Sequence, residues 1–261
     1  MDAIRKWSMG MKIKVAKYIA DFLAEKGIRY NFTVTGGGAM HLNDAFGHHD
    51  KITCIYNHHE QASAIAAEGY ARLTGKVALV CVTSGPGGTN AITGVLGGWQ
   101  DSIPMFVVSG QVKRETTTWS TDVPLRQLGD QEFQIADCVK NMTKYSDMVT
   151  DPEQIRYHLE KAWYLCNHGR KGPVWLDIPL DVQAAIVDSE TLIGYVPESE
   201  NVTVDPEMIK QVLDKIENAK RPVILAGTGI RLGGAYKEFL EVIHQLQIPV
   251  VTAWNAHDLL E

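Results

Sequence analysis

The chain has 261 residues, of which 45% are hydrophobic and 21% are charged, which is enough material for one or two folded domains. Its formal net charge of -6 argues against a nucleic-acid-binding surface, because such surfaces need clustered basic residues. No run of 18 apolar residues predicts a membrane span, and the first residues lack the apolar core of a signal peptide, so we expect a cytoplasmic protein.

Strands and helices alternate over the first part of the chain. The pattern predicts strands at 30–34, 52–56, 77–82, 105–108 and 174–178, and helices at 12–27, 36–46, 61–73, 85–98 and 152–167. Residues 77–82 form an uninterrupted apolar run, which is typical of a strand buried on both faces of a parallel sheet. The alternation therefore predicts an α/β fold with an open, mostly parallel sheet and helices on both faces.

The pattern changes near residue 187. We expect a first domain over 11–187, an exposed linker over 188–204 and the beginning of a second, Rossmann-like α/β domain over 205–261. In this last region the sequence predicts helices at 206–219 and 234–246 and strands at 222–226 and 250–251. Two strands are few for a stable domain, so the second domain is expected to be truncated.

Polar or glycine-rich clusters follow four of the expected strands. They are 35–38, 57–60, 83–90 and 109–111. The carboxyl ends of parallel strands share one edge of a sheet, where ligands bind, so the four clusters together predict a site. Each glycine loop taken singly has an equally good explanation as a tight turn.

Glu60 stands at the start of an expected helix. A glutamate at this place is most often a solvated residue favoured by the helix dipole. Here, however, small residues such as Ala62, Ser63 and Ala64 follow it, which suits close helix packing better than exposure. Burial would raise the pKa of this carboxyl while the helix N-terminus would lower it. Such a carboxyl could exchange a proton with a bound heterocycle.

A set of motifs, in order and spacing, carries a resemblance to a known family. They are Gly36-Gly37, His59-Glu60-Gln61, Glu68-Gly69-Tyr70-Ala71-Arg72, Thr83-Ser84-Gly85-Pro86-Gly87 with Thr89-Asn90, Asp101-Ser102-Ile103-Pro104, Gly110-Gln111-Val112, Thr143-Lys144, and Gly172-Pro173-Val174 leading to Asp177-Ile178-Pro179. With them, residues 35–181 resemble the N-terminal, pyrimidine-binding domain of thiamine-diphosphate-dependent enzymes, and the acetolactate synthase group most of all. No single motif decides this, but together they are specific.

The resemblance implies roles for particular residues. The family's glutamate hydrogen-bonds N1′ of the cofactor's aminopyrimidine and promotes loss of the thiazolium C2 proton, a role that falls to Glu60. The further site residues implied are Pro86 and Asn90 beside the pyrimidine, Gly36, Gly37 and Gly38 near the thiazolium, Gln111 facing the substrate, Lys144 in its Thr-Lys setting, and His59. Together with His58, His59 either relays protons or only orients Glu60, and the sequence does not decide between the two.

Two departures from the family pattern matter. Acetolactate synthases usually carry Phe-Gln-Glu where this chain has Asp130-Gln131-Glu132, which suggests a more polar acceptor pocket. The chain also contains no Gly-Asp-Gly, the family's Mg²⁺-binding motif, and we expect no metal ligands within these residues. Mg²⁺ would then be bound by a missing C-terminal domain of a longer enzyme. The turn Gly227-Thr228-Gly229 could belong to an FAD site, although a glycine turn after a strand is the commoner explanation.

The resemblance implies a carboligase that decarboxylates a 2-keto acid, with pyruvate the plausible donor, and transfers a two-carbon unit to a carbonyl acceptor. Alternatives are a decarboxylase or lyase of the same family and a non-catalytic pyrimidine-domain subunit. Retention of Glu60, Gln111 and Lys144 argues against the last. A homodimer or homotetramer is expected, with no nucleic-acid or membrane partner.

Overall fold

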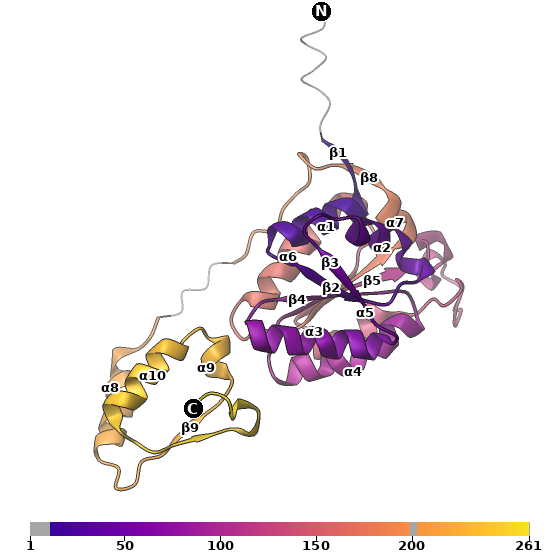
Figure 1. Ribbon diagram of the computed structural model, residues 1–261. Helices are drawn as coiled ribbons and strands as arrows, with labels where there is room; N and C mark the ends of the chain where they lie inside the picture. Colours follow the sequence, from indigo (N-terminus) through magenta and orange to yellow (C-terminus); the bar gives the residue numbers. More distant parts are fainter. Residues whose placement is uncertain (1–10, 199–202, 261) are drawn as a thin grey trace, which may run out of the picture. The chain divides into compact units, whose positions relative to one another are not determined.

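The structure is a computed structural model that describes residues 11–198 and 203–260 (Figure 1). The chain divides into two compact units, unit 1 over Met1–Pro197 and unit 2 over Glu198–Glu261. No helix in the described ranges is both long and apolar enough to cross a membrane.

Unit 1 is built on a six-stranded sheet in which every pair of neighbours is parallel. Its strands, in sheet order, are β3 (Thr53–Tyr56), β2 (Tyr30–Thr33), β4 (Ala78–Val82), β5 (Met105–Gln111), β7 (Val174–Pro179) and β6 (Tyr145–Met148). The predicted α/β fold with a parallel sheet is confirmed.

Helices cover both faces of this sheet (Figure 1). One face carries α1 (Val15–Glu25), α2 (Met40–Gly47), α6 (Ile155–Asn167) and α7 (Leu180–Ala184), and the other carries α3 (Glu60–Thr74), α4 (Pro86–Gln100) and the short α5 (Ile135–Cys138). Short 3₁₀ turns are η2 (Gly37–Ala39), η3 (Arg114–Thr116), η4 (Thr118–Ser120), η5 (Lys140–Met142) and η6 (Pro152–Gln154).

The central strands are buried along their whole length because both faces are covered. Every residue of β4, β5 and β7 is buried. Leu79 and Cys81 pack in the core cluster beneath α1 and α2. Side chains alternate along a strand, so Val80 and Val82 face the opposite helical layer.

Helices α3 and α4 pack closely because small residues meet at their contact. A Cβ added to Gly94 of α4 would lie 2.6 Å from the Cβ of Ala64 in α3, closer than real side chains approach. At the far end of the same contact, Arg72 bonds to Glu68 and donates from Nη2 to Asp101 Oδ2 at 2.5 Å. The alanine-rich sequence after Glu60 therefore serves helix packing.

Three features of unit 1 differ from the sequence prediction. The helix expected over 12–27 begins only at Val15, because Lys12–Lys14 form strand β1 and pair antiparallel with β8 (Ile186–Asp188). Strand β6 was not predicted. Leu192, in the expected linker, is buried in the core of unit 1, so only the later part of that segment leaves the domain. Linker residues 199–202 lie outside the described residues.

Unit 2 contains few elements. They are α8 (Pro206–Glu217), β9 (Ile224–Ala226), α9 (Gly229–Leu232), α10 (Tyr236–Leu246), β10 (Val250–Thr252) and η7 (Trp254–Ala256). The two strands pair in parallel. The small buried cluster of this unit consists of Ala226, Ala256 and Leu259, and no residue of α8 is buried.

Candidate functional site

The sheet of unit 1 has a switch point between β2 and β4. These strands are neighbours, but the chain leaves β2 toward α2 on one face and leaves β4 toward α4 on the other. The carboxyl ends of such strands are the usual ligand position in open α/β sheets. The loops 34–36 and 83–85 lie at this position.

Glycines let three strand ends approach one another at this edge. A Cβ on Gly36 would lie 2.5 Å from the Cβ of Thr83, and one on Gly38 would lie 2.7 Å from Ser84 Oγ. Gly38 N also donates to Thr83 Oγ1 at 3.1 Å. A Cβ on Gly110 would overlap the Gly38 carbonyl oxygen, so the end of β5 joins the same contact. Close packing of backbone thus forms this part of the sheet edge.

Gly37 differs from its two neighbours. It is exposed, and an added Cβ would meet no atom within 4 Å. No contact within the described part of the chain therefore requires a glycine at this position. The site keeps an open backbone surface here, which a ligand could approach closely.

Glu60 is the first residue of α3, and its carboxylate faces α4. Asn90 Nδ2 donates to Glu60 Oε2 at 2.9 Å. The second oxygen, Oε1, accepts no hydrogen bond from any residue in the described part of the chain, and a Cβ on Gly87 would come within 3.5 Å of it. Glu60 therefore presents one held oxygen and one available oxygen, with the exposed Pro86 nearby at the start of α4.

His58 and His59 are both exposed. His59 precedes α3, and its Nδ1 accepts a hydrogen bond from Gln61 N at 3.1 Å, which caps the helix. This contact fixes the backbone on which Glu60 stands. Of the two roles left open by the sequence, the geometry favours orientation of Glu60.

Gln111 ends β5 at the same edge, but its side chain points inward. It is 1% exposed, and its Nε2 donates to the Phe133 carbonyl at 2.8 Å and to Asp177 Oδ2 at 2.9 Å. Ser109 Oγ donates to the other Asp177 oxygen at 2.5 Å. Burial raises the pKa of Asp177 to about 7, although these two hydrogen bonds act in the opposite direction. In this chain Gln111 therefore belongs to a buried network and does not face an open substrate site.

The structure does not bring Lys144 to Glu60. Lys144 precedes β6, whereas Glu60 follows β3, so in a parallel sheet the two residues lie at opposite edges. Lys144 Nζ donates to the His168 carbonyl at 2.5 Å. The role of Lys144 as a site residue therefore finds no support in a contact with Glu60 in this structure, and it stays a prediction.

The loop that carries Asp130-Gln131-Glu132, which the sequence analysis relates to the acceptor pocket, contacts Gly85 at the start of α4. Gly85, at φ +52°, has room for no Cβ because the Gln131 carbonyl oxygen lies against it. Glu132 organises this loop, since its Oε1 accepts from Thr118 N and Oγ1 and its Oε2 accepts from Leu128 N and Gly129 N. Burial alone would raise the pKa of Glu132, but these hydrogen bonds lower it overall. The neighbouring Asp130 is exposed.

Gln183 of α7 is a residue that the sequence analysis missed. It is fully buried, and its Nε2 donates to the Gly38 and Ile178 carbonyls, both at 2.7 Å. These hydrogen bonds restrain the glycine loop after β2 by joining it, through Gln183, to the end of β7. A lone glutamine in a short helix gives no sequence signal for this role.

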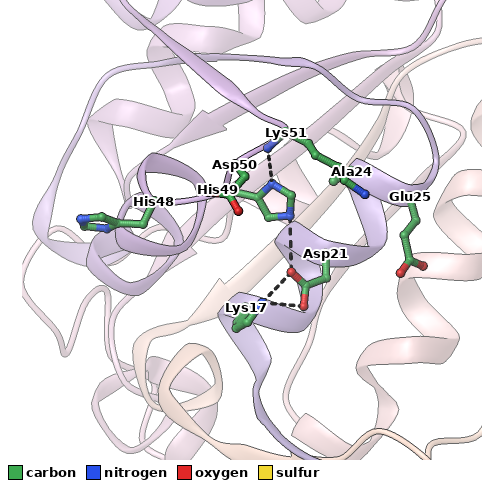
Figure 2. A pocket seen from close by; sticks show the side chains of 8 residues that line it. All are labelled: Lys17, Asp21, Ala24, Glu25, His48, His49, Asp50 and Lys51. Carbon is green, nitrogen blue, oxygen red and sulfur yellow. Dashed lines mark hydrogen bonds and ion pairs between the residues drawn. The ribbon is translucent and has the colours of Figure 1, made fainter.

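No metal centre is evident within the described ranges, where no three His, Cys, Asp or Glu side chains are grouped to hold an ion. A polar cavity of about 250 Å³ lies elsewhere, between α1 and the residues after α2 (Figure 2). Its charges pair internally, with Lys17 Nζ bound to both Asp21 oxygens at 2.8 Å and His49 Nε2 3.4 Å from Asp21 Oδ1. It contains none of the predicted site residues.

Comparison with known proteins supports the resemblance. Residues 13–137 match the family described as thiamine pyrophosphate enzyme, N-terminal TPP binding domain, and residues 209–261 match thiamine pyrophosphate enzyme, central domain.

Individual relatives agree with this. The chain is 36% identical over 254 residues to the acetolactate synthase large subunit of Lactococcus lactis subsp. lactis (strain IL1403), covering 92% of this chain and 42% of the relative. It is 35% identical over 247 residues to the acetolactate synthase isozyme 3 large subunit of Escherichia coli (strain K12), covering 90% and 40%. The chain thus spans about two fifths of the length of the curated relatives it matches.

Proposed function

The chain belongs to the thiamine pyrophosphate enzyme family, and we propose that unit 1 supplies the pyrimidine half of a thiamine diphosphate site in an acetolactate synthase-like carboligase. The carboxylate of Glu60 is the observation that carries this proposal. One of its oxygens is held by Asn90 and the other has no partner among the described residues.

The residues at the edge fit an aminopyrimidine ring. An available carboxylate oxygen at Glu60 is an acceptor for a ring N–H, and Gly87 leaves space beside it. Gly37 offers open backbone on the other side of the switch point. The family's residue roles for Glu60, Asn90, Pro86 and the glycine loop stay predictions that this geometry supports.

The bound cofactor supplies the carbanion chemistry that neither side chains nor backbone provide. The chain's part in this proposal is to hold and move one proton. Glu60 accepts or donates a proton at Oε1, while Asn90 restrains Oε2 and the His59 cap restrains the helix start. Positioned groups of this kind typically accelerate a proton transfer by about 10² to 10⁴.

The substrate proposal is a 2-keto acid donor, pyruvate in the first instance, and a polar carbonyl acceptor. Asp130 supports the polar acceptor, because the family's usual phenylalanine is replaced by an exposed carboxylate in the loop that touches Gly85. A keto-sugar is an acceptor of this class.

Mg²⁺ and the diphosphate are assigned to residues outside this chain, because the 261 residues contain no Gly-Asp-Gly. FAD is the less supported part of the proposal. Its support is the turn between β9 and α9, where a Cβ added to Gly227 or Gly229 would meet nothing within 4 Å. Backbone at the carboxyl end of β9 is thus open to a ligand.

A second copy of the chain is the proposed partner of unit 1. The outer surface of α3 and α4 exposes large apolar side chains, among them Ile65 and Leu96, and Leu73 at the end of α3. Large apolar side chains exposed on two packed helices support an interface at this surface. Sedimentation of the full-length protein should show a dimer or larger assembly, and an active monomer would contradict this part of the proposal.

The chain itself allows a direct test of the pyrimidine site. In an NMR titration of residues 1–261 with thiamine diphosphate, the amide signals of Gly37, Gly87 and Glu60 and the side-chain amide of Asn90 should shift. Binding should be weak and independent of Mg²⁺, because the proposed metal site lies outside the chain. Shifts confined to other residues, or tight Mg²⁺-dependent binding, would contradict the proposal.

A further inference from the structure

A second cavity lies at the amino-terminal edge of the sheet, opposite the Glu60 edge. It measures about 340 Å³, within the range of small-molecule sites, and is lined by Trp99, Gln100, Lys144, Arg170 and Lys171. These residues come from the end of α4, the start of β6 and the loop before β7, so three separate segments converge. Three of the five side chains carry a positive charge, in a chain whose net charge is -6.

Lys144 is held in this cavity by packing and by a hydrogen bond. Its Nζ donates to the His168 carbonyl at 2.5 Å. A Cβ added to Gly172 would lie 3.2 Å from Lys144 Cγ and 3.7 Å from Trp99 Cε3, so glycine leaves room for the lysine stem beside the indole. The charge is therefore positioned and is not that of a freely moving surface lysine.

Arg170 is held by a residue with an unusual backbone. Its Nε donates to Ser102 Oγ at 2.7 Å, and its two terminal nitrogens bond to no residue in the described ranges. Ser102 has φ +62°, a left-handed conformation that glycine would adopt with less strain. Glycine would also remove the hydroxyl that anchors Arg170. Ser102 therefore orients the guanidinium group of Arg170 through a single hydrogen bond, at Nε.

The positive side chains in this cavity are not needed to satisfy the carbonyl groups at the C-terminal end of α4. The carbonyls in the last turn of α4 already accept backbone hydrogen bonds, Gly97 from Asp101, Gly98 from Ile103 and Trp99 from Ser102. The cavity in Figure 2 differs, because its lining includes acidic side chains and one of them, Asp21, pairs with Lys17 and His49. Among the described residues that line the 340 Å³ cavity, none is acidic.

We propose that this cavity binds a small phosphate-bearing ligand with a planar ring, of the mononucleotide class. Two lysines and an arginine match the charge of a phosphate, and the free guanidinium nitrogens match two of its oxygens. The Trp99 indole, 38% exposed, provides a flat apolar surface for a ring. This site is independent of the proposed carboligase function and lies at the other edge of the sheet.

The test is an NMR titration of residues 1–261 with three probes: adenosine 5′-monophosphate, inorganic phosphate and adenosine. The Gly172 amide and the Trp99 indole N–H should shift with saturation, most tightly for the nucleotide, more weakly for phosphate and not measurably for adenosine. Arg170→Gln and Lys171→Gln should each weaken nucleotide binding about tenfold or more, since each removes a charged partner of the phosphate. Lys210→Gln, which removes an exposed charge from α8, should leave binding unchanged.

Ser102→Gly separates this proposal from a general structural effect. The variant keeps every charge and relieves the backbone, so its thermal stability should be equal or higher while nucleotide binding weakens. The proposal is overturned if no probe saturates up to about 10 mM, if Arg170→Gln and Lys171→Gln bind like the wild type, or if Lys210→Gln weakens binding equally. Equal affinity for phosphate and nucleotide would overturn the mononucleotide class.

Discussion

The two units contain equally apolar strands but bury them very differently. Every residue of β4, β5 and β7 in unit 1 is buried, whereas in β9 and β10 of unit 2 only Ala226 is. Unit 1 has helices on both faces of its sheet, while in unit 2 the amphipathic helix α8 buries no residue. Strand sequence alone therefore does not produce a core, because the covering surfaces must also be present.

This difference bears on which part of the chain can hold a site rigidly. The contacts around Glu60 and the glycine loop lie at the end of the six-stranded sheet of unit 1, whose central strands are buried. The turn at Gly227 stands on a two-stranded pair with little cover. We therefore expect unit 1 to respond strongly to changes in packing, and unit 2 weakly.

The largest contrast should come from removing one large side chain in each unit. Trp175 is 0% exposed and donates from Nε1 to Ser109 Oγ at 2.8 Å. Trp175→Ala should lower the free energy of unfolding of unit 1 by about 3–5 kcal/mol. Leu225→Ala, at a residue 72% exposed, should change the stability of unit 2 by less than about 0.5 kcal/mol. Urea unfolding followed by NMR signals of each unit measures both, and similar losses would break the comparison.

Two helical glycines of unit 1, one buried between helices and one exposed, allow the same comparison within a single unit when each is replaced by alanine. Gly94→Ala should cost about 1–3 kcal/mol, because the new methyl would lie 2.6 Å from Ala64 Cβ and 2.8 Å from backbone atoms of α3. Gly69→Ala should instead stabilise by about 0.5–1 kcal/mol, since its methyl would meet nothing within 4 Å. Thermal unfolding of both variants decides this, and the same sign for the two would refute the packing argument.

A further contrast is expected between two paired carboxylates, one in each unit. Hydrogen bonds outweigh burial and lower the pKa of Glu132, so its contribution to stability is present above its unfolded pKa near 4.5 and is lost as pH falls through the lower folded pKa. Glu132→Gln should cost about 1–2 kcal/mol at neutral pH and flatten the acid limb of the stability curve.

Asp258 of unit 2 is the control for Glu132. Arg231 lowers its pKa, but the carboxylate is fully exposed, so solvent screens the pair. Asp258→Asn should leave the pH dependence of both units almost unchanged. Denaturant titrations between pH 3 and pH 7, about the range in which carboxylates titrate, compare the two variants. A larger effect at Asp258 than at Glu132 would reverse the comparison between the units.

The central strands were predictable because they are apolar along their length. Strand β6 was not, since Tyr145, Ser146 and Asp147 are polar or partly exposed at the sheet edge and only Met148 is buried. Strand β1 was missed for another reason, because its partner β8 lies far away in the sequence. Neither local pattern nor helical spacing carries that information.

Because β6 was not predicted, the sequence did not indicate at which edge of the sheet Lys144 lies. A motif resemblance can identify a residue as a candidate. The edge of the sheet at which that residue lies, however, depends on whether the residue precedes or follows a strand. For Glu60 and Asn90 the strands were predicted, and the structure places the two side chains 2.9 Å apart. Gln183 had no predictive signal, because its role depends on carbonyls at Gly38 and Ile178 that only the fold brings together. The catalytic role of Glu60 stays a prediction.

Exchange of the thiazolium C2 proton tests that role most directly, since C2 exchange reports the proton transfer itself. In the full-length protein with thiamine diphosphate and Mg²⁺, Glu60→Gln should slow hydrogen–deuterium exchange at C2 by about 10² to 10⁴. Glu68 offers the matched control, because it lies on the same helix with its carboxylate bonded to Arg72. Glu68→Gln should leave exchange close to the wild-type rate. Near-normal exchange in Glu60→Gln, or a larger loss in Glu68→Gln, would contradict the account.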